Sequence, residues 1–146
     1  YNLHVILRFE LETALIEGWL EAADVPGAWN EKVKQYLGLE VPDDASGCLQ
    51  DIHWSHGSFG YFPTYALGNL YSAQLLATME AAIPDLWDQV NEGVFGPCLC
   101  WLREHVHRVG RRETAVEILR DATGKEPDTD AFLEYLESKY SALYNL

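Results

Sequence analysis

Apolar residues recur at helical spacing along almost the whole of this sequence. Leucines stand at positions 3, 7, 11 and 15, and Ile16, Trp19 and Leu20 continue the same stripe. Residues four apart share one face of an α-helix, so this run predicts a helix over 2–22, with Glu10 and Glu12 on its solvent side. Because both sides of its first turns are apolar, we expect this helix to be deeply buried.

Further helices are predicted along the rest of the chain, and no run alternates apolar and polar residues as a half-buried strand would. The sequence therefore predicts an all-α fold, a helical array. The expected helices span 28–37, 63–83, 85–93, 96–108, 112–123 and 129–144.

Glycine and proline mark the ends of these segments. Gly38 fits a left-handed C-cap, and Pro63 suits the first position of a helix. Pro42 interrupts regular structure, and Asp43 suits a turn or an N-cap. Since the intervening loops are short, we expect residues 1–146 to form a single helical region.

Charge and composition exclude several classes of partner. The 146 residues carry a formal net charge of −13, which repels phosphate backbones and anionic membranes, so neither nucleic acid nor membrane is an expected partner. No apolar run approaches the roughly 20 residues needed to cross a bilayer. The three cysteines, an odd number in a chain with a core of its own, predict reduced thiols and a cytoplasmic protein.

The first residues suggest that the sequence is part of a longer chain. There is no initiator Met, and the helical pattern begins at once with no capping residue before it. We therefore expect a preceding segment in the natural protein.

The segment Gly47–Tyr71 concentrates most of the chemistry. It combines histidines, tyrosines and glycines in one irregular stretch. A peptide hydrolase must stabilise an oxyanion, and His N–H and Tyr O–H groups are suitable donors at neutral pH, so His53, Tyr61 and Tyr65 are candidate catalytic residues. Asp51 can orient an imidazole. The alternative is that this segment is an aromatic packing or interface loop with no chemistry.

The same segment closely resembles the signature of the carboxypeptidase Taq family of metallocarboxypeptidases. The resemblance extends along the whole chain and rests on two long motifs. G-x-x-Q-D-x-H-W is matched by Gly47, Gln50, Asp51, His53 and Trp54, and G-x-F-G-Y-F-P-T-Y-x-L-G-N by Gly57, Phe59, Gly60, Tyr61, Phe62, Pro63, Thr64, Tyr65, Leu67, Gly68 and Asn69. The opening run also resembles the family through Tyr1, His4, Arg8, Phe9 and Glu10.

This resemblance implies the C-terminal portion of an enzyme that removes C-terminal amino acids from peptides. It implies a catalytic zinc or cobalt ion held by an H-E-x-x-H helix and a downstream Glu. This sequence contains no H-E-x-x-H, and the resemblance implies that the metal ligands lie outside it. We therefore expect no metal in this chain, and we expect the isolated chain to be inactive. The implied partners are peptides with a free C-terminus, the remainder of the same chain and a second subunit in a homodimer.

The resemblance also assigns roles to individual residues. His53 is expected to contact the substrate carbonyl and Tyr65 to donate to the oxyanion, with Tyr61 as a weaker third. Gln50 and Asp51 are expected to bind substrate.

Arg8 is a candidate for binding the terminal carboxylate of the substrate, because guanidinium groups bind carboxylates bidentately. The alternative, which we favour from spacing, is a local ion pair with Glu12 at i+4. His4 shares a helix face with Arg8, and we expect it to be a core histidine.

Other clusters have simpler interpretations. Cys98, Cys100, His105 and His107 do not have the spacing of common zinc modules, and we predict no metal there. His56 is predicted to be a loop residue. The arginines of the C-terminal half are expected to form a solvated face or a salt-bridge surface; they are Arg103, Arg108, Arg111, Arg112 and Arg120.

Two other function classes compete with the peptidase fragment. One is a stand-alone all-α interaction or structural module, and the other is a helical bundle that stacks a small ligand in its aromatic loop. A stand-alone module should have a polar surface, whereas a fragment should expose an apolar face where the rest of the enzyme packs.

Overall fold

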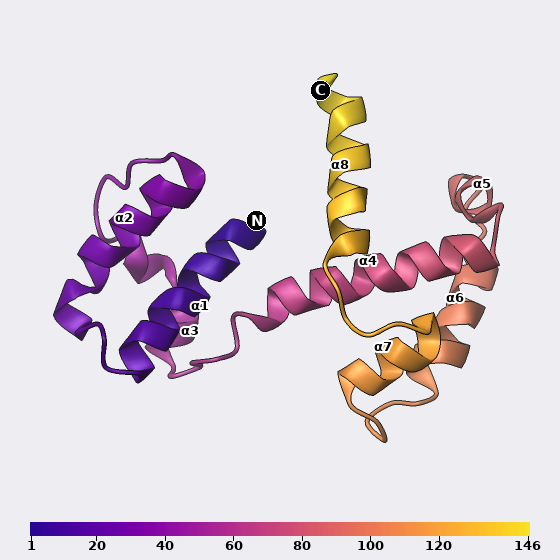
Figure 1. Cartoon of the computed structure of the whole chain (residues 1–146), viewed down its shortest axis with the longest axis horizontal. Coiled ribbons are helices and arrows are strands. Elements are labelled where there is room, and N and C mark those ends of the chain that lie inside the picture. Colours follow the sequence, from indigo (N-terminus) through magenta and orange to yellow (C-terminus); the bar gives the residue numbers. More distant parts are fainter. The chain divides into compact units, whose positions relative to one another are not determined.

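The computed structural model describes residues 1–146, and every regular element in it is helical, as predicted. The chain divides into two compact units, Tyr1–Leu67 and Gly68–Leu146. Unit 1 contains α1 (Asn2–Ile16), η1 (Ala22–Asp24), α2 (Val25–Leu37), η2 (Cys48–Gln50), α3 (Ile52–Ser55) and the first turn of α4 (Thr64–Ala82). Unit 2 contains the rest of α4, then α5 (Leu86–Asn91), α6 (Gly96–Leu102), the π-helical η3 (Arg103–His107), α7 (Ala115–Thr123) and α8 (Asp130–Tyr144) (Figure 1).

Helix α1 is shorter and more exposed than its apolar pattern predicts. It ends at Ile16 rather than at residue 22, because the chain turns at Gly18, whose φ of 72° is left-handed. Val5, Leu7 and Leu11 are buried, but Phe9 is 51% exposed and Ile16 is 72% exposed. The expectation of deep burial is therefore wrong for this chain, since α1 packs against α2 and the aromatic loop but leaves the side that contains Phe9 and Ile16 uncovered.

The core of unit 1 lies between α1 and α2. Leu7 and Leu11 pack against Trp29 and Val33 of α2 and against Cys48. Helix α2 begins three residues earlier than predicted and ends where predicted, with Gly38 in the left-handed conformation at φ 68°. This core holds α1 in place, and residues 47–63 bond to α1 through Arg8 and Glu12.

Residues 38–63 are mostly loops and turns, as the glycines predict. This segment contains two short helical elements, η2 and α3, and a turn in which Asp43 accepts a hydrogen bond from the Ser46 amide at 2.7 Å. Gly47 is required by close packing, because a Cβ there would lie 2.6 Å from Cγ1 of Val41.

Unit 2 has a smaller core built on Met79, Leu86 and Trp101. The predicted helix over 96–108 changes to π-helical geometry at Arg103, and α7 begins at Ala115 behind a capping box formed by Thr114 and Glu117. Helix α8 follows its predicted bounds closely but has no buried residue. Figure 1 shows it projecting from the end of the loop after α7.

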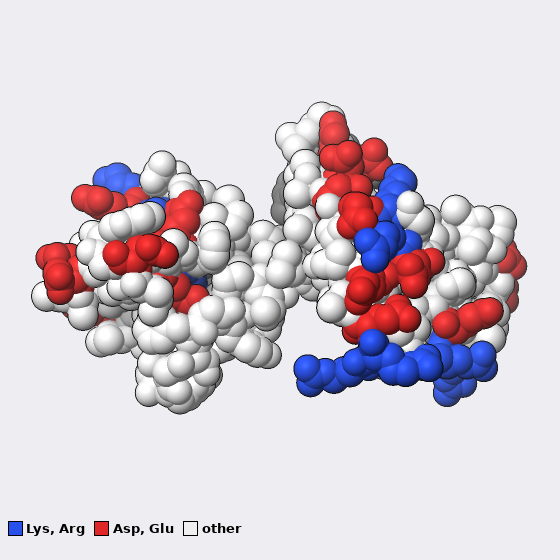
Figure 2. Space-filling model, turned by 60° about the horizontal axis from the view of Figure 1, so that its bottom comes forward, with Lys and Arg blue, Asp and Glu red and all other residues white.

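Four arginines of unit 2 lie close together in sequence: Arg103, Arg108, Arg111 and Arg112 are all exposed, within ten residues of one another. Figure 2 shows a row of Lys and Arg side chains along one edge of this unit, and a second group of them among the Asp and Glu side chains. Arg120 is paired with Glu126. No helix in the structure combines the length and the hydropathy that crossing a bilayer requires.

Candidate functional site

The candidate site is built around His53, on the single turn of α3. Asp51 is the N-cap of this helix, and its Oδ1 accepts a hydrogen bond from the His53 amide at 2.8 Å. This cap holds the backbone of His53 directly over the aspartate. The histidine side chain is 19% exposed, so it lies at the surface of unit 1 without projecting from it.

Both ring nitrogens of His53 have partners. Nδ1 lies 3.2 Å from Oδ1 of Asp51, and Nε2 lies 3.3 Å from the hydroxyl of Tyr65. Two aromatic rings fix the plane of the imidazole: Tyr61 stacks on it with centroids 5.7 Å apart, and Phe62 meets it edge-on at 4.9 Å. The structure therefore brings together His53, Tyr61 and Tyr65, the three residues chosen from the sequence.

Tyr65 lies in the first turn of α4, as predicted, and keeps an exposed edge. It is 37% exposed and Tyr61 is 52% exposed. Partial burial, reinforced by the neighbouring Tyr61, raises the pKa of Tyr65 above its ordinary value. Its hydroxyl is therefore protonated at neutral pH and available as a hydrogen-bond donor.

Asp51 connects this aromatic group to α1. Its carboxylate is fully buried, and Oδ2 accepts a hydrogen bond from Nε of Arg8 at 2.7 Å across 43 residues of sequence. The guanidinium lies between the rings of Trp29 and Phe62, at 4.5 and 4.6 Å from their centroids. The arginine side chain is 12% exposed. This charged, hydrogen-bonded partner offsets the cost of burying the Asp51 carboxylate.

Arg8 is also held from within α1. One terminal nitrogen, Nη1, donates to the His4 carbonyl and contacts Nδ1 of His4, both at 2.9 Å. Burial, followed by the charge of Arg8, lowers the pKa of His4 below its ordinary value. His4 is therefore a neutral acceptor for Arg8 and a half-buried packing residue.

The favoured pairing of Arg8 with Glu12 is wrong. Glu12 is 3% exposed rather than on the solvent side of α1. Its two carboxylate oxygens accept hydrogen bonds from Nε1 of Trp54 at 2.9 Å and from the amide of Gly60 at 3.0 Å. Gly60 has a φ of 77°, so this turn of the aromatic loop requires glycine. Glu12 thus anchors the loop that carries Tyr61.

The other candidates around His53 have local partners. The Gln50 side chain is exposed and donates to the Ala45 carbonyl. His56 is a loop residue whose Nδ1 lies 3.3 Å from the Ser58 hydroxyl. In these contacts neither Gln50 nor His56 bonds to His53, Tyr61 or Tyr65.

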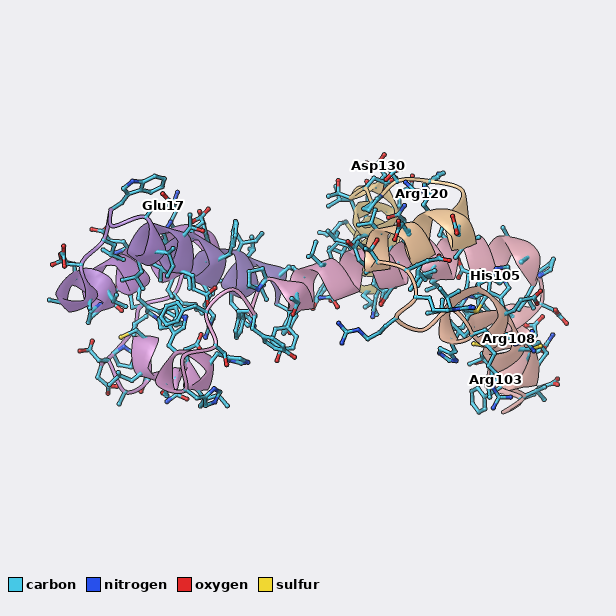
Figure 3. The ribbon with its side chains drawn as sticks, turned by 90° about the horizontal axis from the view of Figure 1, so that it is seen from below. Glu17, Arg103, His105, Arg108, Arg120 and Asp130 are labelled. Carbon is cyan, nitrogen blue, oxygen red and sulfur yellow. The ribbon has the colours of Figure 1, made fainter.

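The residues of this chain do not fit a catalytic metal ion. Nowhere do three or more His, Cys, Asp or Glu side chains converge as metal ligands. At the candidate site, both nitrogens of His53 are already hydrogen-bonded and Asp51 is neutralised by Arg8. In unit 2, the His105 ring packs on Trp101 at 4.6 Å. Figure 3 labels His105 together with Arg103 and Arg108 on the same helical segment.

The arrangement offers hydrogen-bond donors and a ring held in a fixed orientation. Tyr65 and Tyr61 can donate from their hydroxyls, and His53 can donate or accept at Nε2. Such a group is suited to stabilising a developing negative charge on oxygen.

Sequence reasoning gave Glu12, Trp29 and Phe62 no role in this group, and it treated His4 as a core histidine beside Arg8. Their signal was weak, because large aromatic rings and a helical carboxylate predict packing or solvent exposure alone. A carboxylate next to the leucine stripe, at Glu12, was the one unusual feature.

Known proteins resemble this chain over its whole length. Residues 1–140 match the family described as carboxypeptidase Taq (M32) metallopeptidase. Carboxypeptidase 1 of Bacillus subtilis (strain 168) is 44% identical over 146 residues, which is 100% of this chain and 29% of that protein. Thermostable carboxypeptidase 1 of Thermus thermophilus is 46% identical over 144 residues, 99% of this chain and 28% of that protein.

A solved structure gives the same result. The M32 carboxypeptidase of Deinococcus radiodurans R1 superposes with a TM-score of 0.96 at 44% identity, over 100% of this chain and 30% of that one. The chain thus spans less than one third of the length of these relatives.

Proposed function

Since this chain belongs to the carboxypeptidase Taq (M32) metallopeptidase family, we propose that it is the C-terminal part of an enzyme that removes C-terminal amino acids from peptides. Within that enzyme it supplies residues that bind substrate and stabilise the transition state. The isolated chain is inactive in this proposal, because the metal-binding part lies elsewhere.

The observation that carries the proposal is the contact between His53 and Tyr65. Nε2 and the tyrosine hydroxyl lie 3.3 Å apart, and the histidine is anchored on its other side by a buried aspartate. Two polar groups held in fixed positions at an exposed aromatic edge are characteristic of preorganised catalytic donors. An aromatic packing loop does not require them.

These residues act on the substrate carbonyl. As water adds to a peptide carbonyl, negative charge develops on its oxygen, and a neutral hydroxyl donor stabilises that charge. A tyrosine hydroxyl is protonated at neutral pH, and the environment of Tyr65 raises its pKa further. We assign Tyr65 to the oxyanion, His53 to the substrate carbonyl or backbone, and Tyr61 to a supporting contact. Gln50, which is exposed, is proposed to be part of the substrate-binding wall. Asp51 was expected there too, but its carboxylate is fully buried, so we propose that it supports the wall from behind by holding His53.

The family is described as a metallopeptidase, and we propose that the metal of the whole enzyme is zinc or cobalt. No group of side chains in this chain fits it. Its ligands are therefore expected in the part of the enzyme outside residues 1–146.

The surface of unit 1 favours a part of a larger enzyme over a stand-alone module. The outer side of α1 exposes Leu3, Ile6 and Phe9, each at least 41% exposed. A helix apolar on both sides is typical of one packed between two layers. The remaining layer is proposed to come from the rest of the enzyme. By the same family resemblance, the enzyme is proposed to be a homodimer, and its three free cysteines support a cytoplasmic location.

The test is hydrolysis of a blocked dipeptide with added Zn²⁺ or Co²⁺, by this chain and by the natural longer chain that contains it. Only the longer chain should cleave. In the longer chain, His53→Ala and Tyr65→Phe should each lower kcat by about 10²-fold or more, the loss associated with removing one oxyanion donor.

A matched control is Tyr36→Phe, which removes a tyrosine hydroxyl that is bound to Glu10 in the same unit but lies outside the site. Its kcat should be unchanged. Cleavage by the 146-residue chain alone, or full activity in both site variants, would refute the proposal.

A further inference from the structure

Asp51 and His53 share a proton whose position follows from their chemistry. A carboxylate only accepts hydrogen bonds, so the proton between Oδ1 of Asp51 and Nδ1 of His53, 3.2 Å apart, belongs to the imidazole. In the neutral ring, Nε2 then carries the lone pair. The hydroxyl of Tyr65, 3.3 Å from Nε2, is the donor in that contact. The tautomer of His53 therefore decides how the Tyr65 hydroxyl is oriented.

Asp51 can act in this way only as a buried anion, and Arg8 is the group that balances its charge. Nε of Arg8 donates to Oδ2, the oxygen that His53 does not use. Each carboxylate oxygen of Asp51 therefore has its own partner residue: Oδ1 bonds to His53 and Oδ2 to Arg8. Loss of Arg8 would leave a fully buried charge without a counter-ion, and the carboxyl group would move or take up a proton.

Arg8 is poorly placed to bind a substrate carboxylate at the same time. Its Nε is bound to Asp51 and its Nη1 to His4, and its flat faces are covered by Trp29 and Phe62. A guanidinium that binds a carboxylate bidentately presents two neighbouring N–H groups. Each edge of the guanidinium that could bind a carboxylate bidentately includes either Nε or Nη1, and both of these nitrogens already have a partner.

From these contacts we propose that Arg8 is a positioning residue: it holds Asp51, and through Asp51 it fixes the ring orientation and tautomer of His53. Nε2 then accepts from the Tyr65 hydroxyl and holds it in place until substrate binds. When substrate is bound, the Tyr65 proton turns to the oxyanion, and Nε2 is left to accept a hydrogen bond from the substrate backbone. The order of action runs from α1, through the cap of α3, to the first turn of α4. This inference rests on the proposed function for its kinetic consequences, and it differs from the carboxylate-binding role that the sequence suggested for Arg8.

The kinetic test uses the longer natural chain and a double-mutant cycle. Arg8→Gln should lower kcat by about 10- to 100-fold, the usual cost of losing an outer partner of an active-site group, with KM changed less than about threefold. In the Arg8→Gln/His53→Ala double variant, kcat should match that of His53→Ala alone, because Arg8 acts through His53. If Arg8 binds substrate directly, KM rises and the two losses multiply.

A second readout does not depend on activity. In the longer chain labelled with ¹⁵N-histidine, the His53 signals are assigned by their loss in His53→Ala. The wild type should show a protonated Nδ1 and an unprotonated Nε2 at neutral pH, and Arg8→Gln should give a mixture of tautomers. An unchanged tautomer in Arg8→Gln would overturn the inference, even where hydrolysis is absent and the proposed function has failed.

Two further variants keep the test decisive. Arg8→Lys keeps a cation beside Asp51 and should retain the wild-type tautomer and at least one third of the kcat; it serves if Arg8→Gln does not fold. Lys32→Gln is the matched control, since it removes the cation paired with Glu10 in the same unit and should leave both readouts unchanged. A loss of kcat in Lys32→Gln equal to that in Arg8→Gln would reduce Arg8 to a general structural role.

Discussion

Unit 1 and unit 2 are both helical, but they use their polar side chains differently. In unit 1, carboxylates on α1 and in the central stretch bond to partners far away in sequence, as in Arg8 with Asp51 across 43 residues and Glu12 with Gly60 across 48. In unit 2, the polar contacts are mainly local caps, as in the Thr114–Glu117 box. Gln74 is an exception, since its amide bonds to Glu126 and Asp128.

This difference marks unit 1 as the part of the chain that positions the candidate site. Long-range charged hydrogen bonds hold side chains from separate elements in one fixed arrangement, which a catalytic group requires. Local caps define where helices begin and end, but they do not bring distant residues together. In α8 even the apolar contacts are few, since none of its residues is buried.

The largest expected contrast is in core packing. Leu11→Ala in unit 1 removes a side chain that is 1% exposed and should lower the free energy of opening there by about 2–5 kcal/mol. Leu133→Ala in α8, where the side chain is 56% exposed, should cost less than about 0.5 kcal/mol. Amide hydrogen exchange measures both. Equal losses would show that α8 is packed as firmly as α1.

A smaller effect is expected at the long-range polar contact of unit 2. Gln74→Ala leaves the Glu126 carbonyl and the Asp128 amide without their partner, and it should destabilise residues 124–130 by about 1–3 kcal/mol. Exchange in unit 1 should not change. Gln35→Ala, an exposed truncation on α2, is the control. A loss of protection that spreads into unit 1 would contradict the division into units.

The smallest expected effect is a pH dependence confined to unit 1. Because the pKa of His4 is lowered in the folded chain, the unfolded chain takes up a proton first as the pH falls. The contribution of His4 is complete above its ordinary pKa of 6.5 and is lost as the pH falls from there toward the lowered value. The slope is at most about 1.4 kcal/mol per pH unit.

His4→Gln keeps an acceptor for Arg8 and removes the titration. Its opening free energy in α1 and α2, followed by amide exchange between about pH 7.5 and 5.5, should fall less steeply than that of the wild type. Identical pH slopes in the two proteins would mean that His4 does not titrate differently on folding.

Sequence reasoning succeeded where short-range rules apply. Gly38 ends α2 in the left-handed conformation as predicted, and Tyr65 lies in the first turn of a helix that begins beside Pro63. The end of α1 was predicted wrongly because the apolar stripe continues past Gly18, although the backbone turns at that glycine. A pattern of side chains does not report the φ of one glycine.

What the sequence determined by itself is the helical class, most helix bounds and the kinds of chemistry at positions 53, 61 and 65. The helix bounds depend on residues within a few turns of one another. The chemistry depends on the side-chain type, because an imidazole or a phenol has the same hydrogen-bonding groups in any fold. The tertiary structure decided which partner each charge found. The i+4 spacing made Glu12 as available to Arg8 as any other acid. Packing of α1 against α2 and the aromatic loop buried both carboxylates. Glu12 accepts hydrogen bonds from Trp54 and Gly60, whereas Asp51 is paired with the Arg8 guanidinium, which offsets the cost of burying its charge.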